Sequence, residues 1–87
     1  ALVAEGVREG LTPETAGLLV AQTVYGAARM ALETGKSPEA LRIQVTSPGG
    51  TTEAGLAAMD RLGFTKALEE AVKAAAQRGA ELRRMNE

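Results

Sequence analysis

The sequence predicts an all-α protein: a helical bundle of about four to five helices that forms an intertwined homodimer. Its 87 residues include 17 Ala and 10 Leu, but only six Val, one Ile and two aromatic residues. Ala and Leu favour helices, whereas strands are enriched in β-branched and aromatic residues. Ala side chains also bury little area each, so a chain of this length must pack its helices closely or share its core with a partner.

The charge balance and two missing residue types exclude several classes of function. Ten basic and eleven acidic residues leave a net charge of −1 without a block of like charges, so we expect no nucleic-acid partner. The chain has no His and no Cys, which removes the usual transition-metal ligands, the cysteine nucleophile and the imidazole base. We therefore expect no metal site. Any chemistry must depend on hydroxyls, backbone amides, carboxylates or a cofactor.

The first ten residues are predicted to be the end of a helix. The chain opens on Ala1 without the basic start of a signal peptide, and we expect a cytoplasmic protein in which this helix begins upstream. Gly6 should weaken the helix, because glycine is a poor helix former. Gly10 should end it.

A long helix is predicted over residues 12–34. Thr12 can cap its start, Pro13 fits its first turn and Gly35 can end it. Few polar side chains lie between residues 16 and 32, and they are Gln22, Thr23 and Arg29. The helix is therefore apolar on nearly all sides and needs cover on several of them.

Three interpretations of this apolar helix remain open. It is the central helix of a monomeric bundle, it spans a membrane, or a second copy of the chain covers it. Gln22 and Arg29 inside the span disfavour the membrane interpretation, so we expect no membrane partner. We favour the second copy, because small residues would let another backbone approach closely; these are Gly17, Ala21, Gly26 and Ala28.

Three further helices are predicted along the rest of the chain. Ser37 and Pro38 begin a short helix that reaches about residue 44. Apolar residues between 54 and 62 predict a helix of about ten residues that Gly63 ends. With Thr65 as its N-cap, the last helix continues to about residue 85, apolar on one face and charged on the other.

Residues 47–52, Ser-Pro-Gly-Gly-Thr-Thr, have the composition of a ligand-binding turn. Pro48 breaks the preceding helix, while Gly49 and Gly50 permit positive φ and the close approach of a ligand. Gly50, Thr51 and Thr52 then lie at the start of a helix. Their amides could bind an anion there, since unpaired N–H groups and the helix dipole both favour negative charge.

Residue chemistry alone leaves two interpretations of this segment. It is a cradle for a carboxylate or phosphate, with the hydroxyls of Ser47 and Thr52 at its rim, or it is a sharp turn between two helices followed by a cap. The segment lacks the Lys of a phosphate loop, and its glycines do not follow a predicted strand. Neither the Walker motif nor the dinucleotide-binding fingerprint therefore applies.

The same segment and its surroundings resemble Δ1-pyrroline-5-carboxylate reductases. The resemblance rests on residues 45–52 (Val-Thr-Ser-Pro-Gly-Gly-Thr-Thr), on Ala54-Gly55-Leu56, and on Gly63-Phe64 before an Ala-rich charged helix. The long apolar helix is similar to the dimerisation helix of the family. The similar residues there and just before it are Gly10-Leu11, Ala21-Gln22-Thr23, Gly26-Ala27-Ala28 and Met30. The resemblance covers essentially the whole chain.

The resemblance implies an oxidoreductase of proline biosynthesis that reduces 1-pyrroline-5-carboxylate to L-proline. In the family, an N-terminal Rossmann domain binds NADP or NAD, and a C-terminal domain forms the dimer and one wall of the substrate site. Residues 1–87 correspond to the C-terminal dimerisation and substrate-binding domain. Because they contain no nucleotide-binding domain, we expect this fragment alone to be inactive. The resemblance implies a homodimer and leaves further assembly open.

The resemblance also assigns roles within residues 47–52. The amides of Gly50, Thr51 and Thr52 would bind the substrate carboxylate. The Thr52 hydroxyl would hydrogen-bond the ring nitrogen as the catalytic residue, and Ser47 and Gly49 would line the same pocket. Hydride transfer to an imine needs a positioned cofactor rather than a histidine, which agrees with the composition. The alternative function is a non-catalytic helical oligomerisation module.

Overall fold

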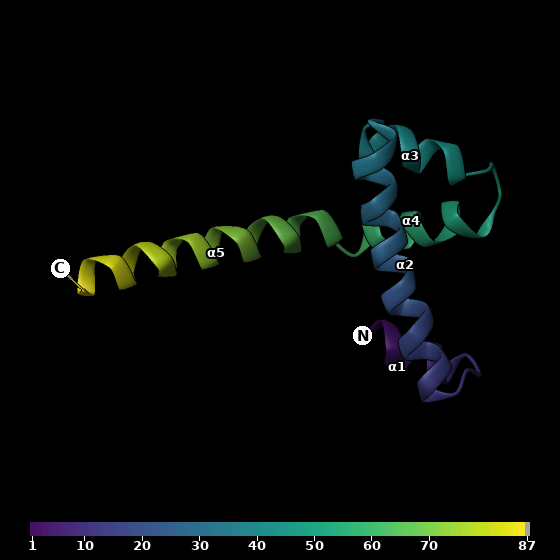
Figure 1. The fold of residues 1–87 in the computed structure, drawn as a ribbon, viewed down its shortest axis with the longest axis horizontal. Coiled ribbons are helices and arrows are strands. Elements are labelled where there is room, and N and C mark those ends of the chain that lie inside the picture. The colour runs from purple at the N-terminus through teal and green to yellow at the C-terminus, as the bar shows by residue number, and fades with distance from the viewer. Residues whose placement is uncertain (87) are drawn as a thin grey trace. The chain divides into compact units, whose positions relative to one another are not determined.

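The computed structural model describes residues 1–86, which form five helices (Figure 1). In chain order these are α1 (Leu2–Arg8), α2 (Pro13–Thr34), α3 (Pro38–Val45), α4 (Thr51–Arg61) and α5 (Phe64–Met85). No strand occurs among the described residues, so the all-α prediction is confirmed. The chain divides into two compact units, Ala1–Gln44 and Val45–Glu87.

In the first unit, α1 packs against the start of α2 (Figure 1). A Cβ placed on Gly6 would lie 3.3 Å from the Cβ of Ala16, so the missing side chain lets the two helices come close. Ala16 is fully buried at this contact. The expected weakening at Gly6 is not seen, because α1 stays helical through this residue and the glycine serves packing. Gly10 follows the end of α1, as predicted.

Local capping signals determine where α2 and α3 begin and end. The Thr12 hydroxyl accepts a hydrogen bond from the amide of Thr15 at 3.2 Å, and Gly35 ends α2 in the left-handed conformation. The Ser37 hydroxyl accepts a bond from the amide of Ala40 at 3.1 Å, which caps α3. These three bounds confirm the sequence prediction, because each depends on residues within one turn of the helix end.

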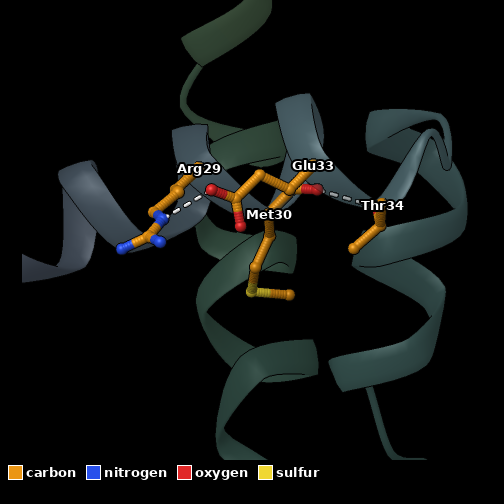
Figure 2. Close-up of polar contacts among 4 residues, drawn as sticks. All are labelled: Arg29, Met30, Glu33 and Thr34. Atoms are coloured by element: carbon orange, nitrogen blue, oxygen red, sulfur yellow. Dashed lines mark hydrogen bonds and ion pairs between the residues drawn. The ribbon is translucent and has the colours of Figure 1, made fainter.

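The surface of α2 is largely apolar and exposed in the single chain. Leu18 is 69% exposed and Leu32 is 84% exposed. Polar contacts occur near the end of the helix, where Arg29 Nε lies 2.7 Å from Glu33 Oε1 and the Thr34 hydroxyl donates to the carbonyl of Met30 at 2.7 Å (Figure 2). Within residues 1–86, no helix combines the length and apolar character that crossing a membrane requires.

In the second unit, α4 and α5 contact each other around a single glycine. Arg61 is the last residue of α4 and Leu62 is its C-cap, while Gly63 adopts a φ of 80° and serves as the N-cap of α5. The prediction that Thr65 caps α5 is wrong, because the helix already begins at Phe64. The left-handed conformation of Gly63 both ends one helix and starts the next, which leaves no position for a separate cap.

Candidate functional site

Residues 47–50 form a turn that leads directly into α4. The amide of Gly50 donates to the carbonyl of Ser47 at 3.0 Å, which closes the turn. Pro48 and Gly49 occupy its two central positions, and Gly49 has a φ of 73°. Proline followed by a residue of positive φ is typical of a type II turn, and glycine adopts this φ without steric cost. The Pro-Gly pair therefore explains the turn from local sequence alone.

Gly50 is required for a different reason than Gly49. Its φ of −85° and ψ of 178° suit any residue. A Cβ at this position, however, would lie 3.1 Å from the carbonyl oxygen of Ser47 and 3.2 Å from its hydroxyl oxygen. The Ser47 side chain thus lies against the backbone of Gly50, at the residue that caps α4. A side chain here would require Ser47 to shift by a few tenths of an ångström.

The first two residues of α4 provide unused hydrogen-bond donors. Thr51 and Thr52 are exposed and occupy the first turn, where backbone amides have no acceptor within the helix. Gly50 offers no side chain to cap them, and no other described residue accepts from either amide. The helix dipole adds partial positive charge at this end. Two amides and the adjacent hydroxyls are therefore available to an anion.

The predicted site residues differ in whether their backbone amides already have a hydrogen-bond partner within the chain. The amide of Gly50 was expected to bind the ligand together with those of Thr51 and Thr52, but it donates to Ser47 inside the turn. The amide of Gly49 also has a partner within the chain. Ser47 and Thr52 both lie at this bend, with exposed side chains. Because Pro48 and Gly49 occupy the two central positions of the turn, the amide of the next residue, Gly50, closes it and is not available to a ligand.

Sequence reasoning missed Glu53. Its Oε1 atom accepts a hydrogen bond from the amide of Gly49 at 3.2 Å, so the carboxylate reaches back from α4 to the turn. Glu53 is the third residue of α4, which is the spacing of a capping box. That spacing, three residues after the cap Gly50, is the signal that could have identified it.

The described residues contain neither a Rossmann-type dinucleotide site nor a cluster of metal ligands. A Rossmann site needs a strand followed by a glycine-rich turn and a helix, and residues 1–86 form no strand. No group of three or more acidic, His or Cys side chains in this part of the chain is arranged to hold a metal ion. The turn at the start of α4 is therefore the candidate site, and its donors suit a small anion.

Comparison with known proteins covers almost the whole chain. Residues 1–82 match the family model described as pyrroline-5-carboxylate reductase dimerisation. The chain is 49% identical over 74 residues to pyrroline-5-carboxylate reductase 2 of Bacillus subtilis, which covers 85% of this chain and 27% of that protein. It is 48% identical over 82 residues to pyrroline-5-carboxylate reductase of Pseudomonas aeruginosa, which covers 94% of this chain and 30% of that protein.

A solved structure shows the same fold. The crystal structure of Plasmodium falciparum pyrroline carboxylate reductase with NADP bound matches with a TM-score of 0.85 and 32% sequence identity. The match covers 88% of this chain and 31% of that one. The chain thus spans 27–31% of the length of these three relatives.

Proposed function

Because the chain belongs to the pyrroline-5-carboxylate reductase dimerisation family, we propose that it supplies the dimer interface and the substrate-carboxylate site of a cytoplasmic reductase. That enzyme reduces 1-pyrroline-5-carboxylate to L-proline. The observation that carries the proposal is the turn before α4, where the amides of Thr51 and Thr52 have no acceptor among residues 1–86 at the positive end of a helix. Family membership supplies the substrate for this anion site.

The substrate carboxylate binds at the first turn of α4. The amides of Thr51 and Thr52 donate to its oxygens, and the Ser47 hydroxyl lines the same site. Gly49 and Gly50 contribute the backbone shape of the turn, since their amides are paired within the chain. A carboxylate is a strong acceptor for backbone N–H groups at a helix start, so two fixed amides can orient a small amino acid.

Thr52 acts on the ring nitrogen. The amide of Thr52 binds the substrate carboxylate, and the hydroxyl of the same residue hydrogen-bonds the imine nitrogen. An alcohol is a weak acid near neutral pH, so this group orients the ring instead of serving as a strong proton donor. Orientation matters because hydride transfer depends on the alignment of the imine carbon with the donor.

The nicotinamide cofactor, NADPH or NADH, supplies the hydride and binds mainly to a separate domain. Residues 1–86 have no strand on which a Rossmann-type nucleotide site could be built, so we assign the residues of this chain roles toward the substrate and the dimer only. Its second contribution is the homodimer. Leu18, Val24 and Leu32 of α2 are each at least 60% exposed in the single chain, and a second copy covers them.

A chimaeric enzyme tests the proposal. Residues 1–82 of this chain replace the matching segment of the Pseudomonas aeruginosa reductase, and proline formation is followed by nucleotide oxidation. Losing a hydrogen bond to a charged or polarised partner costs about 1.5–3 kcal/mol, so Thr52→Ala should lower kcat/KM about 10- to 100-fold. Thr52→Ser keeps the hydroxyl and should retain most of the rate.

Thr65→Ala is the matched control, because Thr65 lies in α5 and away from the turn in sequence. It should leave kcat/KM unchanged. If Thr52→Ala behaves like Thr65→Ala, the assigned site is wrong. If the unmodified chimaera dimerises but neither reduces the imino acid nor binds L-proline, the chain is an oligomerisation module without the substrate site.

A further inference from the structure

Among residues 1–86, the carboxylate of Glu53 is the one charged group that hydrogen-bonds the turn of residues 47–50, which we call the substrate turn. It accepts the amide of Gly49 at 3.2 Å, and it does so from the third residue of α4. This bond crosses from the helix back to the turn, so it links the two parts that must keep a fixed geometry. The amides of Thr51 and Thr52 lie between the two bonded residues in the chain.

Gly49 needs such a link more than other residues of the turn. Its φ of 73° is one of many conformations open to glycine, and a free glycine loses much conformational entropy when it is fixed. The neighbouring bond from Gly50 to Ser47 closes only the turn itself. The Glu53 carboxylate also links the turn to α4. This bond restricts the orientation of the first turn of α4 relative to residues 47–50.

We propose that Glu53 is a positioning residue that holds the substrate turn in its binding shape through the hydrogen bond to Gly49. This inference rests on the proposed function, since it assigns Glu53 to the same carboxylate site. Glu53 touches neither substrate nor cofactor. Its hydrogen bond restricts the turn before the substrate arrives, so the turn loses less conformational entropy when the substrate binds.

A role of the Glu53 hydrogen bond and a role of the Glu53 charge predict different substrate affinities for one substitution. Glu53→Gln keeps an acceptor oxygen for the Gly49 amide but removes the negative charge. If the bond matters, this variant binds substrate like the unmodified enzyme. If the charge matters by repelling the substrate carboxylate, the same variant binds substrate more tightly. Glu53→Ala removes both the bond and the charge.

The experiment measures KM for the imino acid, KM for NADPH, kcat, and the affinity for L-proline by calorimetry in the chimaeric reductase. Glu53→Ala should raise KM for the imino acid and the Kd for proline about fivefold, which corresponds to about 1 kcal/mol, because the lost bond is exposed to solvent and acts on the substrate only through the turn. KM for NADPH should not change. Glu53→Gln should restore both values to within twofold.

Glu14→Ala is the matched control, because Glu14 also lies in the first turn of a helix, α2, in the other unit. It should change none of these constants. The inference is overturned if Glu53→Ala matches Glu14→Ala, if Glu53→Gln is as impaired as Glu53→Ala, or if Glu53→Gln binds proline more tightly than the unmodified enzyme.

A chimaera active on the substrate but insensitive at Glu53 overturns this inference alone. An unmodified chimaera that neither turns over nor binds proline overturns the proposed function and this inference together.

Discussion

At the scale of single residues, the turn before α4 uses two adjacent glycines for two separate physical reasons. Gly49 has a positive φ, and nothing lies within 4 Å of the place where a Cβ would be. Gly50 has an ordinary φ but lies so close to Ser47 that a Cβ would press on a backbone carbonyl. A methyl group at Gly49 is therefore opposed by backbone conformation, and one at Gly50 by contact.

Gly49→Ala is expected to lower the free energy of unfolding by about 1–2 kcal/mol, because an L-residue in the left-handed region meets its own carbonyl. Gly55 is the matched control, since it lies inside α4 with nothing within 4 Å of a Cβ and has no positive φ. Gly55→Ala should raise stability by about 0.5–1 kcal/mol. Urea unfolding at one fixed protein concentration measures both. Equal losses in the two variants would contradict the assignment of strain to Gly49.

At the scale of elements, α2 presents apolar side chains on more than one side. Leu18, Tyr25 and Leu32 are spaced seven residues apart and share one side of the helix, and Leu19 and Met30 share another. All five are exposed in the single chain. An amphipathic helix of a monomer has one apolar stripe, so this distribution requires cover on more than one side of α2, which the proposed homodimer would supply.

Leu32→Glu should weaken self-association by at least about 100-fold. Burying a leucine stabilises by about 1.5–3 kcal/mol, and a twofold dimer loses this contribution twice. Lys36→Gln is the control, because Lys36 is exposed and loses only a long hydrogen bond to Gln44, at 3.3 Å. Sedimentation equilibrium measures the dimer Kd of each. A Leu32→Glu variant that associates as tightly as Lys36→Gln would show that this side of α2 faces solvent.

The helices were largely predictable from sequence because their ends depend on local chemistry. Thr12-Pro13 and Ser37-Pro38 carry both the cap and the first-turn proline, and Gly35 supplies the left-handed end. The start of α5 was not predictable in the same way. Gly63 serves two helices at once, and a hydroxyl two residues later offered a more familiar cap.

The candidate site was predictable in place but not in detail. The run of Pro, two Gly and two Thr places a turn before a helix, which the structure has. The Pro-Gly pair also implies that the Gly50 amide closes the turn. It does not imply that Glu53 bonds to Gly49, because that contact depends on the conformation of the Glu53 side chain. The amide of Gly49 could donate either within the chain or to a ligand, and composition alone does not say which acceptor this amide has.

At the scale of the whole molecule, the chain has too little buried surface to be stable alone. Ala16 is the one buried residue among residues 1–86, and it is a small one. Large apolar side chains are exposed in both units, including Phe64 and Leu68 in the second. The six ion pairs within the described part of the chain join residues three or four apart on exposed helix faces, each contributing a few tenths of a kcal/mol. Local interactions of this kind do not offset the entropy of ordering the chain.

The thermal unfolding midpoint should therefore rise with protein concentration. If folding and association are one step, a 100-fold increase in concentration adds about 2.7 kcal/mol to the stability of the folded dimer. For a dimer of two such chains this corresponds to a shift on the order of 5–10 °C. Circular dichroism at 222 nm over a dilution series measures the midpoint, and light scattering on the same samples reports the mass. A midpoint that stays constant over this range, with a monomer mass throughout, would contradict the view that two copies build one core.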